Sequence, residues 1–218
     1  MGGRGSSSSG KSSVSTGGGG SGGTFYDKTS TFAGMSLHDF ENAIRGKSNE
    51  YVGVFDSSGN LLIAGTSYQK GSVAVPNLDP RFANASIVTH NHPSDGGRGI
   101  GGTFSEADIK MLGLTGVNAV RAVANGKGEH TYIMQKSTTR SANPNGLVKA
   151  AERIKSSARM SKTGQTTLAQ VEKKLAAQGK TLTGTQKSAI YLGSMKNTWK
   201  SVAEKNGYDY IPLKKAPW

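Results

Sequence analysis

The chain contains no cysteine and no apolar run near the ~20 residues needed to cross a bilayer. Without thiols it can form neither a disulfide nor a cysteine-ligated zinc site, so any metal must be bound by His, Asp, Glu or backbone oxygen. Hydrophobic residues make up only 34% of its 218 positions, so part of the chain is expected to lie outside a packed core. The first residues lack the apolar core of a secretory signal, and a cytoplasmic location is the expectation.

Positive charge is unevenly distributed along the chain. Residues 1–136 contain 12 Lys/Arg and 10 Asp/Glu, whereas residues 137–218 contain 15 and 4. The second part is therefore expected either to bind an acidic partner, nucleic acid or an acidic protein surface, or simply to carry solvated helix faces. Four aromatic side chains in it could stack on bases: Trp199, Tyr208, Tyr210 and Trp218. Trp199 lies on an apolar stripe and is expected in a core.

Composition and periodicity divide the chain into three segments. Residues 1–23 are almost wholly Gly and Ser and are predicted to form a disordered leader. Residues 30–136 mix strand and helix patterns and predict an α+β domain, or a three-layer α/β domain. Residues 140–218 predict a basic helical extension, with helices at 146–160, 166–178 and 185–205.

Within the middle segment, the hydrophobic period changes from helical to strand-like. Ser36–Gly46 predicts a short amphipathic helix with Ser36 as its N-cap and Gly46 as its stop. Strands are predicted at 51–55, 61–65, 72–75, 85–89, 117–123 and 130–134, with a helical turn at 78–84 and a helix at 104–114.

A candidate metal site follows the fourth of these strands. His90 and His92 are two residues apart at a strand end, so their side chains point the same way. Ser105 and Asp108 have the spacing of a capping box, and a helix N-terminus at Ser105 would direct Asp108 back towards the histidines. Two imidazoles and one carboxylate can bind one divalent metal and leave a position open for water.

A hydrolytic metal site also needs a base that takes a proton from the metal-bound water. Glu50, just before the first strand of the predicted hairpin, is the candidate. Glu41 is the competitor, but it falls on the amphipathic helix, where a solvated carboxylate is expected. Ser105 could donate a hydrogen bond to a developing oxyanion.

Glu50 before Val52-Gly53-Val54-Phe55, then His90-Asn91-His92-Pro93-Ser94, then Ser105 and Asp108 resembles the JAB/MPN (JAMM) metallopeptidase family. The His-Asn-His-Pro-Ser run is similar to the RadC-like branch, and the resemblance covers about residues 48–136. It implies a cytidine-deaminase-like core with zinc bound by His90, His92 and Asp108. It also implies that Glu50 acts as general acid/base and that Ser105 stabilises the tetrahedral intermediate. The loop between Pro93 and Ser105, with Gly96–Gly102 in it, is longer than the family pattern.

We therefore expect a zinc metallopeptidase or isopeptidase that cleaves a peptide or an isopeptide-linked protein. The alternative is a RadC-like nucleic-acid-associated protein of a phage or mobile element, acting as a nuclease or a DNA-binding scaffold through its basic region. A third reading is an interaction module with a vestigial metal site, which the complete ligand set disfavours.

Overall fold

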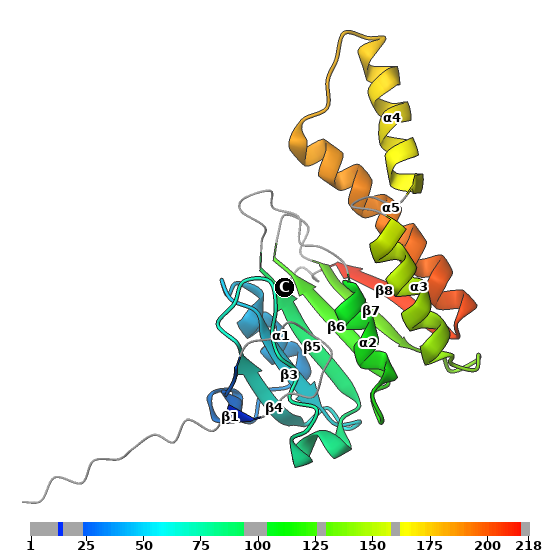
Figure 1. The fold of residues 1–218 in the computed structure, drawn as a ribbon. Coiled ribbons are helices and arrows are strands. Elements are labelled where there is room, and N and C mark those ends of the chain that lie inside the picture. The colour runs from blue at the N-terminus through cyan, green and yellow to red at the C-terminus, as the bar shows by residue number, and fades with distance from the viewer. Residues whose placement is uncertain (1–12, 15–23, 94–103, 126–129, 158–161, 215–218) are drawn as a thin grey trace, which may run out of the picture.

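One mixed β-sheet with helices on both faces organises the chain (Figure 1). This computed structural model describes residues 13–14, 24–93, 104–125, 130–157 and 162–214. Its strands lie in the order β1-β2-β4-β3-β5-β6-β7-β8, and neighbours are antiparallel except for the parallel pair β5 and β6. The prediction of an α+β fold is confirmed.

The strands are β1 (Ser13–Val14), β2 (Phe25–Asp27), β3 (Tyr51–Phe55), β4 (Leu61–Thr66), β5 (Ile87–His92), β6 (Ala119–Ala124), β7 (His130–Lys136) and β8 (Tyr208–Lys214). The helices are η1 (Thr29–Phe32), α1 (Leu37–Arg45), η2 (Pro80–Asn84), α2 (Glu106–Lys110), η3 (Met111–Gly113), α3 (Pro144–Ser157), α4 (Lys162–Ala176) and α5 (Gly184–Lys205), where η marks a 3₁₀ helix.

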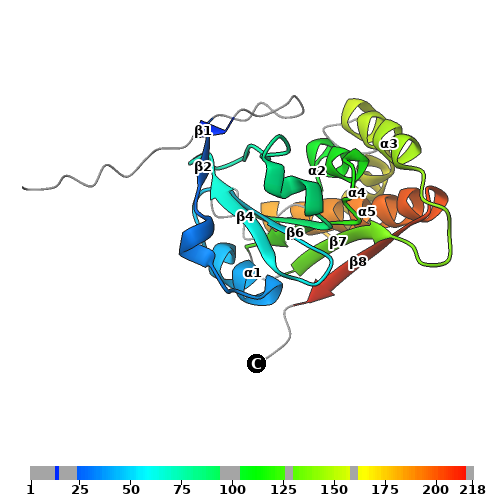
Figure 2. The same ribbon diagram turned by 90° about the horizontal axis from the view of Figure 1, so that it is seen from below.

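The central strands are apolar on both sides, so each face of the sheet needs a cover of helices. On one face, α1 buries Phe40 and Ile44 against Phe55. On the other face, α2 and α5 contribute Ile109 and Trp199 to the larger core. Figure 2 shows α1 on one side of the sheet and α2 and α3 on the other. The buried position of Trp199, which is 1% exposed, confirms its prediction as a core residue.

Local signals in the sequence placed α1 and the hairpin correctly. Ser36 Oγ accepts a hydrogen bond from the Asp39 N–H at 3.1 Å, and Gly46 follows the last helical residue. β3 and β4 pair in the antiparallel register that the turn at 56–60 predicts. Asp56 closes that turn by accepting hydrogen bonds from the N–H groups of Ser58 and Asn60.

The predicted strand at 72–75 is wrong, because these residues form no strand in the structure. The Ala74 N–H donates to the side chain of Ser67 at 3.0 Å instead of to a neighbouring strand. Val73 and Val75 nevertheless pack against the larger core. The apolar residues at 72–75 therefore reflect a loop that is packed against the core, and not a strand.

The prediction of an all-helical segment over 140–218 needs a correction at its end. Tyr208–Lys214 forms β8, which pairs antiparallel with β7 along its whole length. Tyr208 and Tyr210 are buried, at 0% and 8% exposure, because β8 lies under α5 in the larger core. Neither tyrosine is therefore available to stack on bases, and Trp218 lies outside the described residues.

Of the predicted disordered leader at 1–23, only Ser13 and Val14 are described. They form the two-residue β1 and pair with Tyr26 and Phe25 of β2. The backbone groups on the edge of β2 offer these two residues hydrogen-bond partners, and the disorder of the leader stays a prediction. The other leader residues lie outside the described part.

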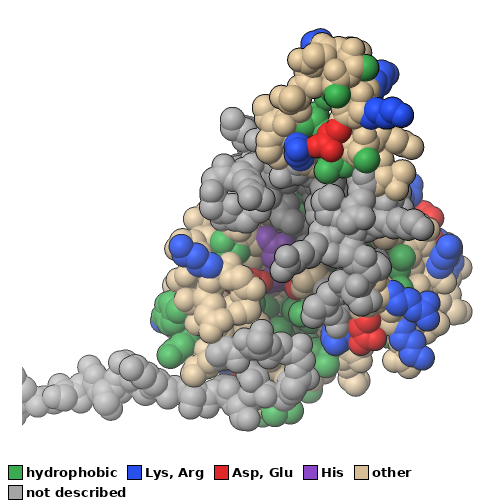
Figure 3. Space-filling view, turned by 45° about the horizontal axis from the view of Figure 1, so that its top comes forward, with side chains coloured by type: hydrophobic (Ala, Val, Ile, Leu, Met, Phe, Trp, Pro, Cys, Tyr) green, Lys and Arg blue, Asp and Glu red, His purple; other side chains and the backbone are tan. Residues whose placement is uncertain are grey.

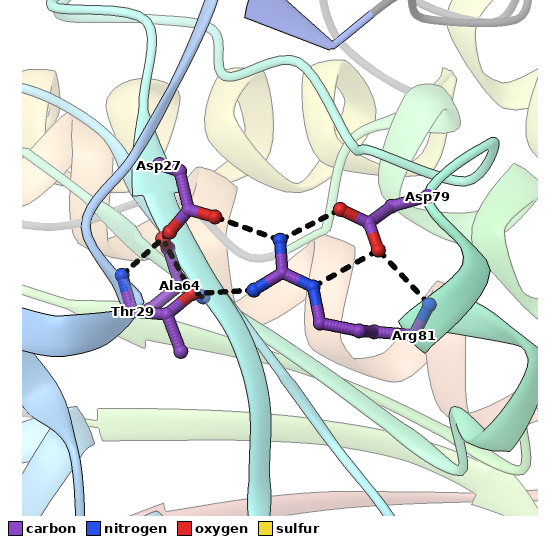
Figure 4. A network of polar contacts seen from close by, with 5 residues as sticks. All are labelled: Asp27, Thr29, Ala64, Asp79 and Arg81. Carbon is purple, nitrogen blue, oxygen red and sulfur yellow. Dashed lines mark hydrogen bonds and ion pairs between the residues drawn. The ribbon is translucent and has the colours of Figure 1, made fainter. Parts of the chain in front are cut away.

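An arginine between two carboxylates ties the start of the sheet to η2 (Figure 4). Arg81 Nη2 lies 2.7 Å from Asp27 Oδ2 and 2.6 Å from Asp79 Oδ2. Thr29 extends the network, because its N–H donates to Asp27 Oδ1 and its Oγ1 accepts from the Ala64 N–H. The network joins segments more than fifty residues apart in sequence.

Among the described residues, no helix combines the length and the hydropathy that a membrane crossing requires. The cytoplasmic location stays a prediction.

Candidate metal centre

Strand register brings Glu50 to the face of the sheet that carries the two histidines. β3 runs antiparallel to β5, with Val52 opposite His90. Directly opposed residues on antiparallel strands point to the same face, and side chains alternate along each strand. Glu50, two residues before Val52, therefore lies on the same face as His90 and His92. This is the face covered by α2.

β5 carries both histidines within the strand, three residues beyond the predicted end at Thr89. The Nε2 atoms of His90 and His92 lie 2.9 Å apart. The His90 side chain is fully buried, whereas 18% of the His92 side chain is exposed. The pair therefore has one inner and one outer imidazole.

The first turn of α2 brings Asp108 to this pair. Ser105 Oγ accepts from the Asp108 N–H, and the Asp108 carboxylate accepts from the Ser105 N–H, which completes the predicted capping box. In this position Oδ1 lies 3.0 Å from His90 Nε2 and Oδ2 lies 3.5 Å from His92 Nε2. Burial alone would raise the pKa of Asp108, but the two histidines lower it well below its ordinary value.

Glu50 approaches the same cluster from the opposite strand. Its Oε1 lies 4.0 Å from His90 Nε2, and its side chain is 8% exposed. Burial raises the pKa of Glu50, and the Asp108 charge adds to this rise, while His90 and His92 oppose it. Two carboxylates of one site therefore have pKa values that are shifted in opposite directions.

Glu50, His90 and His92 form a buried group whose ligand atoms all lie within 4.8 Å of one another, so this group could hold a metal ion. Asp108 is closer to His90 Nε2 than Glu50 is, at 3.0 Å against 4.0 Å. In a tetrahedral zinc site with bonds of ~2.0–2.1 Å, adjacent ligand atoms lie roughly 3.3 Å apart. The two Nε2 atoms lie 2.9 Å apart, and Asp108 lies 3.0 Å from His90 through Oδ1 and 3.5 Å from His92 through Oδ2, so its carboxylate borders both imidazoles and is a second candidate for the third ligand.

Ser105 lies at the rim of this cluster, with an exposed side chain. Its Oγ accepts the capping hydrogen bond from Asp108, which leaves its own O–H proton available to donate. The two roles that the sequence predicted for Ser105 are therefore compatible.

Glu41, the competing base, lies on the opposite face of the sheet and is 3% exposed, so the prediction of a solvated carboxylate is wrong. Its carboxylate accepts hydrogen bonds from Arg121 Nε at 2.5 Å and from Thr89 Oγ1 at 2.9 Å. Thr89 precedes His90 in β5, so its side chain points away from the histidine face. Glu41 anchors α1 to the sheet and has no path to the cluster.

The cluster lies at the end of the sheet from which α4 and the start of α5 project (Figures 1 and 3). In Figure 3, histidine and acidic side chains are visible close to each other on the side of the molecule that faces the viewer. The Gly96–Gly102 loop, which the sequence marked as an insertion, lies outside the described residues.

Sequence reasoning did not single out Asn91, which lies between the two histidines and is fully buried. The signal that would have found it is the strand alternation itself, since a polar residue between two ligands must face the opposite side of the sheet.

No protein-family model, curated protein or solved structure matches this chain. The resemblance to the JAB/MPN family therefore depends on the motif residues alone.

Proposed function

We propose that this chain is a zinc-dependent hydrolase of the JAB/MPN type, most similar to the RadC-like branch. The convergence of His90, His92 and Asp108, with Glu50 4.0 Å from the inner histidine, carries the proposal. Three ligands on one side, with a protein base beside them, are the arrangement of catalytic rather than structural zinc sites.

In this proposal, His90, His92 and Asp108 hold the metal. When bound, zinc supplies Lewis acidity and lowers the pKa of a coordinated water towards about 7. Glu50 takes the proton from the attacking water and delivers it to the leaving group, for which its position beside His90 is suitable. Ser105 donates its O–H to the oxygen on which negative charge develops.

We propose an amide bond as the scissile bond, in a peptide or an isopeptide-linked protein. An amide nitrogen is a poor leaving group, so its departure needs a proton donor, and Glu50 is buried where it can carry that proton. The exposed Ser105 and the partly exposed His92 make the outer side of the cluster the side on which a substrate would bind.

Metal content and cleavage test this proposal together. We expect the purified chain to bind about one zinc per molecule and to cleave a peptide or isopeptide substrate. Glu50→Gln should retain the metal and lose cleavage, and Glu204→Gln, at an exposed site on α5, is the matched control. Absence of bound zinc at neutral pH, or full activity in Glu50→Gln, would contradict the proposal.

A second candidate function is supported by the basic helices. α4 packs against the first part of α5 and forms an arm, residues 162–190, that projects from the end of the sheet carrying the metal centre (Figure 1). Lys173, Lys174 and Lys180 are exposed near its tip, whereas Glu172 pairs with Lys187 at 2.7 Å. The described part of the arm has no exposed large hydrophobic side chain. Lysines without an apolar patch favour a nucleic-acid backbone over a protein surface as the partner.

A nuclease or DNA-binding scaffold would use this arm to hold DNA beside the metal centre. We expect Lys173→Glu/Lys174→Glu/Lys180→Glu to weaken DNA binding, while Lys70→Glu, an exposed lysine remote in sequence, leaves it unchanged. Binding of the wild type should fall steeply between low and moderate salt, because phosphate contacts release counterions. A salt-independent affinity would contradict nucleic-acid binding by the arm.

A further inference from the structure

Asn91 makes three hydrogen bonds to the backbone on either side of Glu50. Its Oδ1 accepts from the Tyr51 N–H at 2.7 Å. Its Nδ2 donates to the carbonyl of Asn49 at 3.1 Å and to that of Lys47 at 3.4 Å. The side chain is fully buried, so water does not compete for these bonds. One amide thus binds the residue before Glu50 and the residue after it.

The strand register explains why a side chain is needed here. The ladder between β3 and β5 ends at the pair Val52–His90. Continued in the same register, Tyr51 would lie opposite Asn91. The Asn91 side chain takes the place of the missing backbone pairing and joins the Glu50 segment to β5.

Glu50 itself is held from the other neighbouring strand. Its N–H donates to the Gln69 carbonyl at 2.7 Å, and its carbonyl accepts from Thr66 Oγ1 at 2.7 Å. These two bonds tie Glu50 to β4 and to the segment that follows it. Among the described residues, Asn91 is the side chain that ties the same segment to the strand of the two histidines.

We propose that Asn91 is a positioning residue that sets the distance between Glu50 and the metal ligands His90 and His92. Side chains alternate along β5. The two histidines therefore point to the face with the candidate metal site, and Asn91 points to the other face, where it contacts the backbone of the Glu50 segment. The tripeptide His90-Asn91-His92 therefore supplies two proposed metal ligands and also positions the proposed base, Glu50. This inference rests on the proposed hydrolase function for its kinetic consequence, but its structural part is independent of that function.

Two variants separate the contacts of Asn91. Asn91→Ala loses all three bonds, while Asn91→Asp keeps the acceptor for Tyr51 and loses the two donations. Asn118→Ala is the matched control, because Asn118 bonds to Ser86 and Lys136 at the other end of β5 and β6. Neither Asn118 nor its partners touch the metal centre.

The kinetic expectation is a split between chemistry and binding. Asn91→Ala should lower kcat by about 10- to 100-fold, because a small misplacement of a catalytic group has this cost. KM and the dissociation constant for Co²⁺, a spectroscopic stand-in for zinc, should stay within about threefold of the wild type. Asn91→Asp keeps the Tyr51 contact but puts a buried carboxylate oxygen against the carbonyls of Lys47 and Asn49, so it should lower kcat at least as much as Asn91→Ala does. Asn118→Ala should change none of the three quantities. Unchanged kcat in Asn91→Ala, with metal bound, would overturn the proposal, and so would a proportional loss of Co²⁺ affinity.

The three hydrogen bonds of the Asn91 side chain to the backbone around Glu50 form a clamp, which hydrogen exchange tests without any assay of activity. In the wild type the Tyr51 amide should be protected, although it lies at the end of a strand, and in Asn91→Ala it should exchange at least about tenfold faster. The Val54 amide, in the middle of β3, should be unchanged. An unprotected Tyr51 amide in the wild type would overturn the clamp even if no Asn91 variant folds. If the wild type binds no zinc but this protection is observed, the hydrolase proposal fails and the clamp stands.

Discussion

Asp108 Oδ1 lies 3.0 Å from His90 Nε2 while the same carboxylate accepts the hydrogen bond that caps α2. One side chain therefore fixes the start of a helix and borders the histidines of the candidate metal site. The consequence is that α2 is held at the site from its first turn. A five-residue helix has little stability of its own, so this attachment matters for its position.

Asp108→Asn should separate the two roles of Asp108. The amide oxygen can still accept from the Ser105 N–H, so the helix cap is preserved, whereas the anionic ligand is lost. We expect the metal dissociation constant to rise by at least about 100-fold, since even residues behind the ligands contribute 10- to 100-fold. Competition with a chromophoric chelator measures this change. Affinity equal to that of the wild type would exclude Asp108 as a ligand and favour Glu50, His90 and His92 as the binding group.

Ser105→Ala and Ser36→Ala form a matched pair of cap deletions. Ser36 caps α1 in the same way as Ser105 caps α2, but it lies on the helix of the opposite face. Each substitution should lower the free energy of unfolding by about 1 kcal/mol in urea denaturation. If Ser105 is the oxyanion donor that we propose, only Ser105→Ala should also lower kcat, by about 100-fold. Equal kcat values in the two variants would show that Ser105 is a cap alone.

Glu41→Gln should destabilise the fold and leave the metal centre intact. On the α1 face Glu41 is buried and Arg121 is half-buried, with 4% and 18% of their side chains exposed. Removing one charge leaves the other uncompensated, at a cost of about 3–5 kcal/mol in the free energy of unfolding. Zinc content after purification should equal that of the wild type. A loss of zinc without a loss of stability would place Glu41, rather than Glu50, at the site.

The contacts of Arg81 with Asp27 and Asp79 should stabilise the fold at neutral pH, and this contribution to the free energy of unfolding should be lost at acid pH. The hydrogen bond from Arg81 lowers the pKa of Asp79 despite its partial burial. Burial alone would raise the pKa of Asp27, but hydrogen bonds from Thr29 and Arg81 lower it. A carboxyl with a lowered folded-state pKa contributes stability above its unfolded value of about 3.9, and this contribution disappears as the pH falls through the folded-state pKa.

The comparison of wild type with Arg81→Gln measures that contribution. The wild type should exceed Arg81→Gln in unfolding free energy by a constant amount above about pH 5, and the difference should shrink below about pH 4. Lys70→Gln, at an exposed lysine, is the control and should show no such trend. A difference that grows as the pH falls would have the wrong sign for this network.

The sequence by itself determined the features that depend on residues close together in the chain. Ser36 and Ser105 cap helices because the groups that they bond lie three residues away, and the turn at Asp56 closes within five residues. The spacing of His90 and His92 directs both imidazoles to one face of any extended strand. The capping-box spacing from Ser105 points to Asp108. The sequence alone therefore predicted three candidate ligands, His90, His92 and Asp108.

Only the tertiary structure decided what depends on pairing between distant segments. β8 is specified by its partner β7, more than seventy residues earlier, and residues 72–75 are apolar because they are buried rather than because they pair. The sequence already favoured Glu50 over Glu41, but only the register of β3 against β5 puts Glu50 on the histidine face, while Glu41 lies on the other face with Arg121. The same register places Asn91 beside Tyr51, where its side chain can bond to the backbone around Glu50. Hydrogen-bond partners along a chain are set by spacing, but partners across a sheet are set by which strands lie side by side, and that is a property of the whole core.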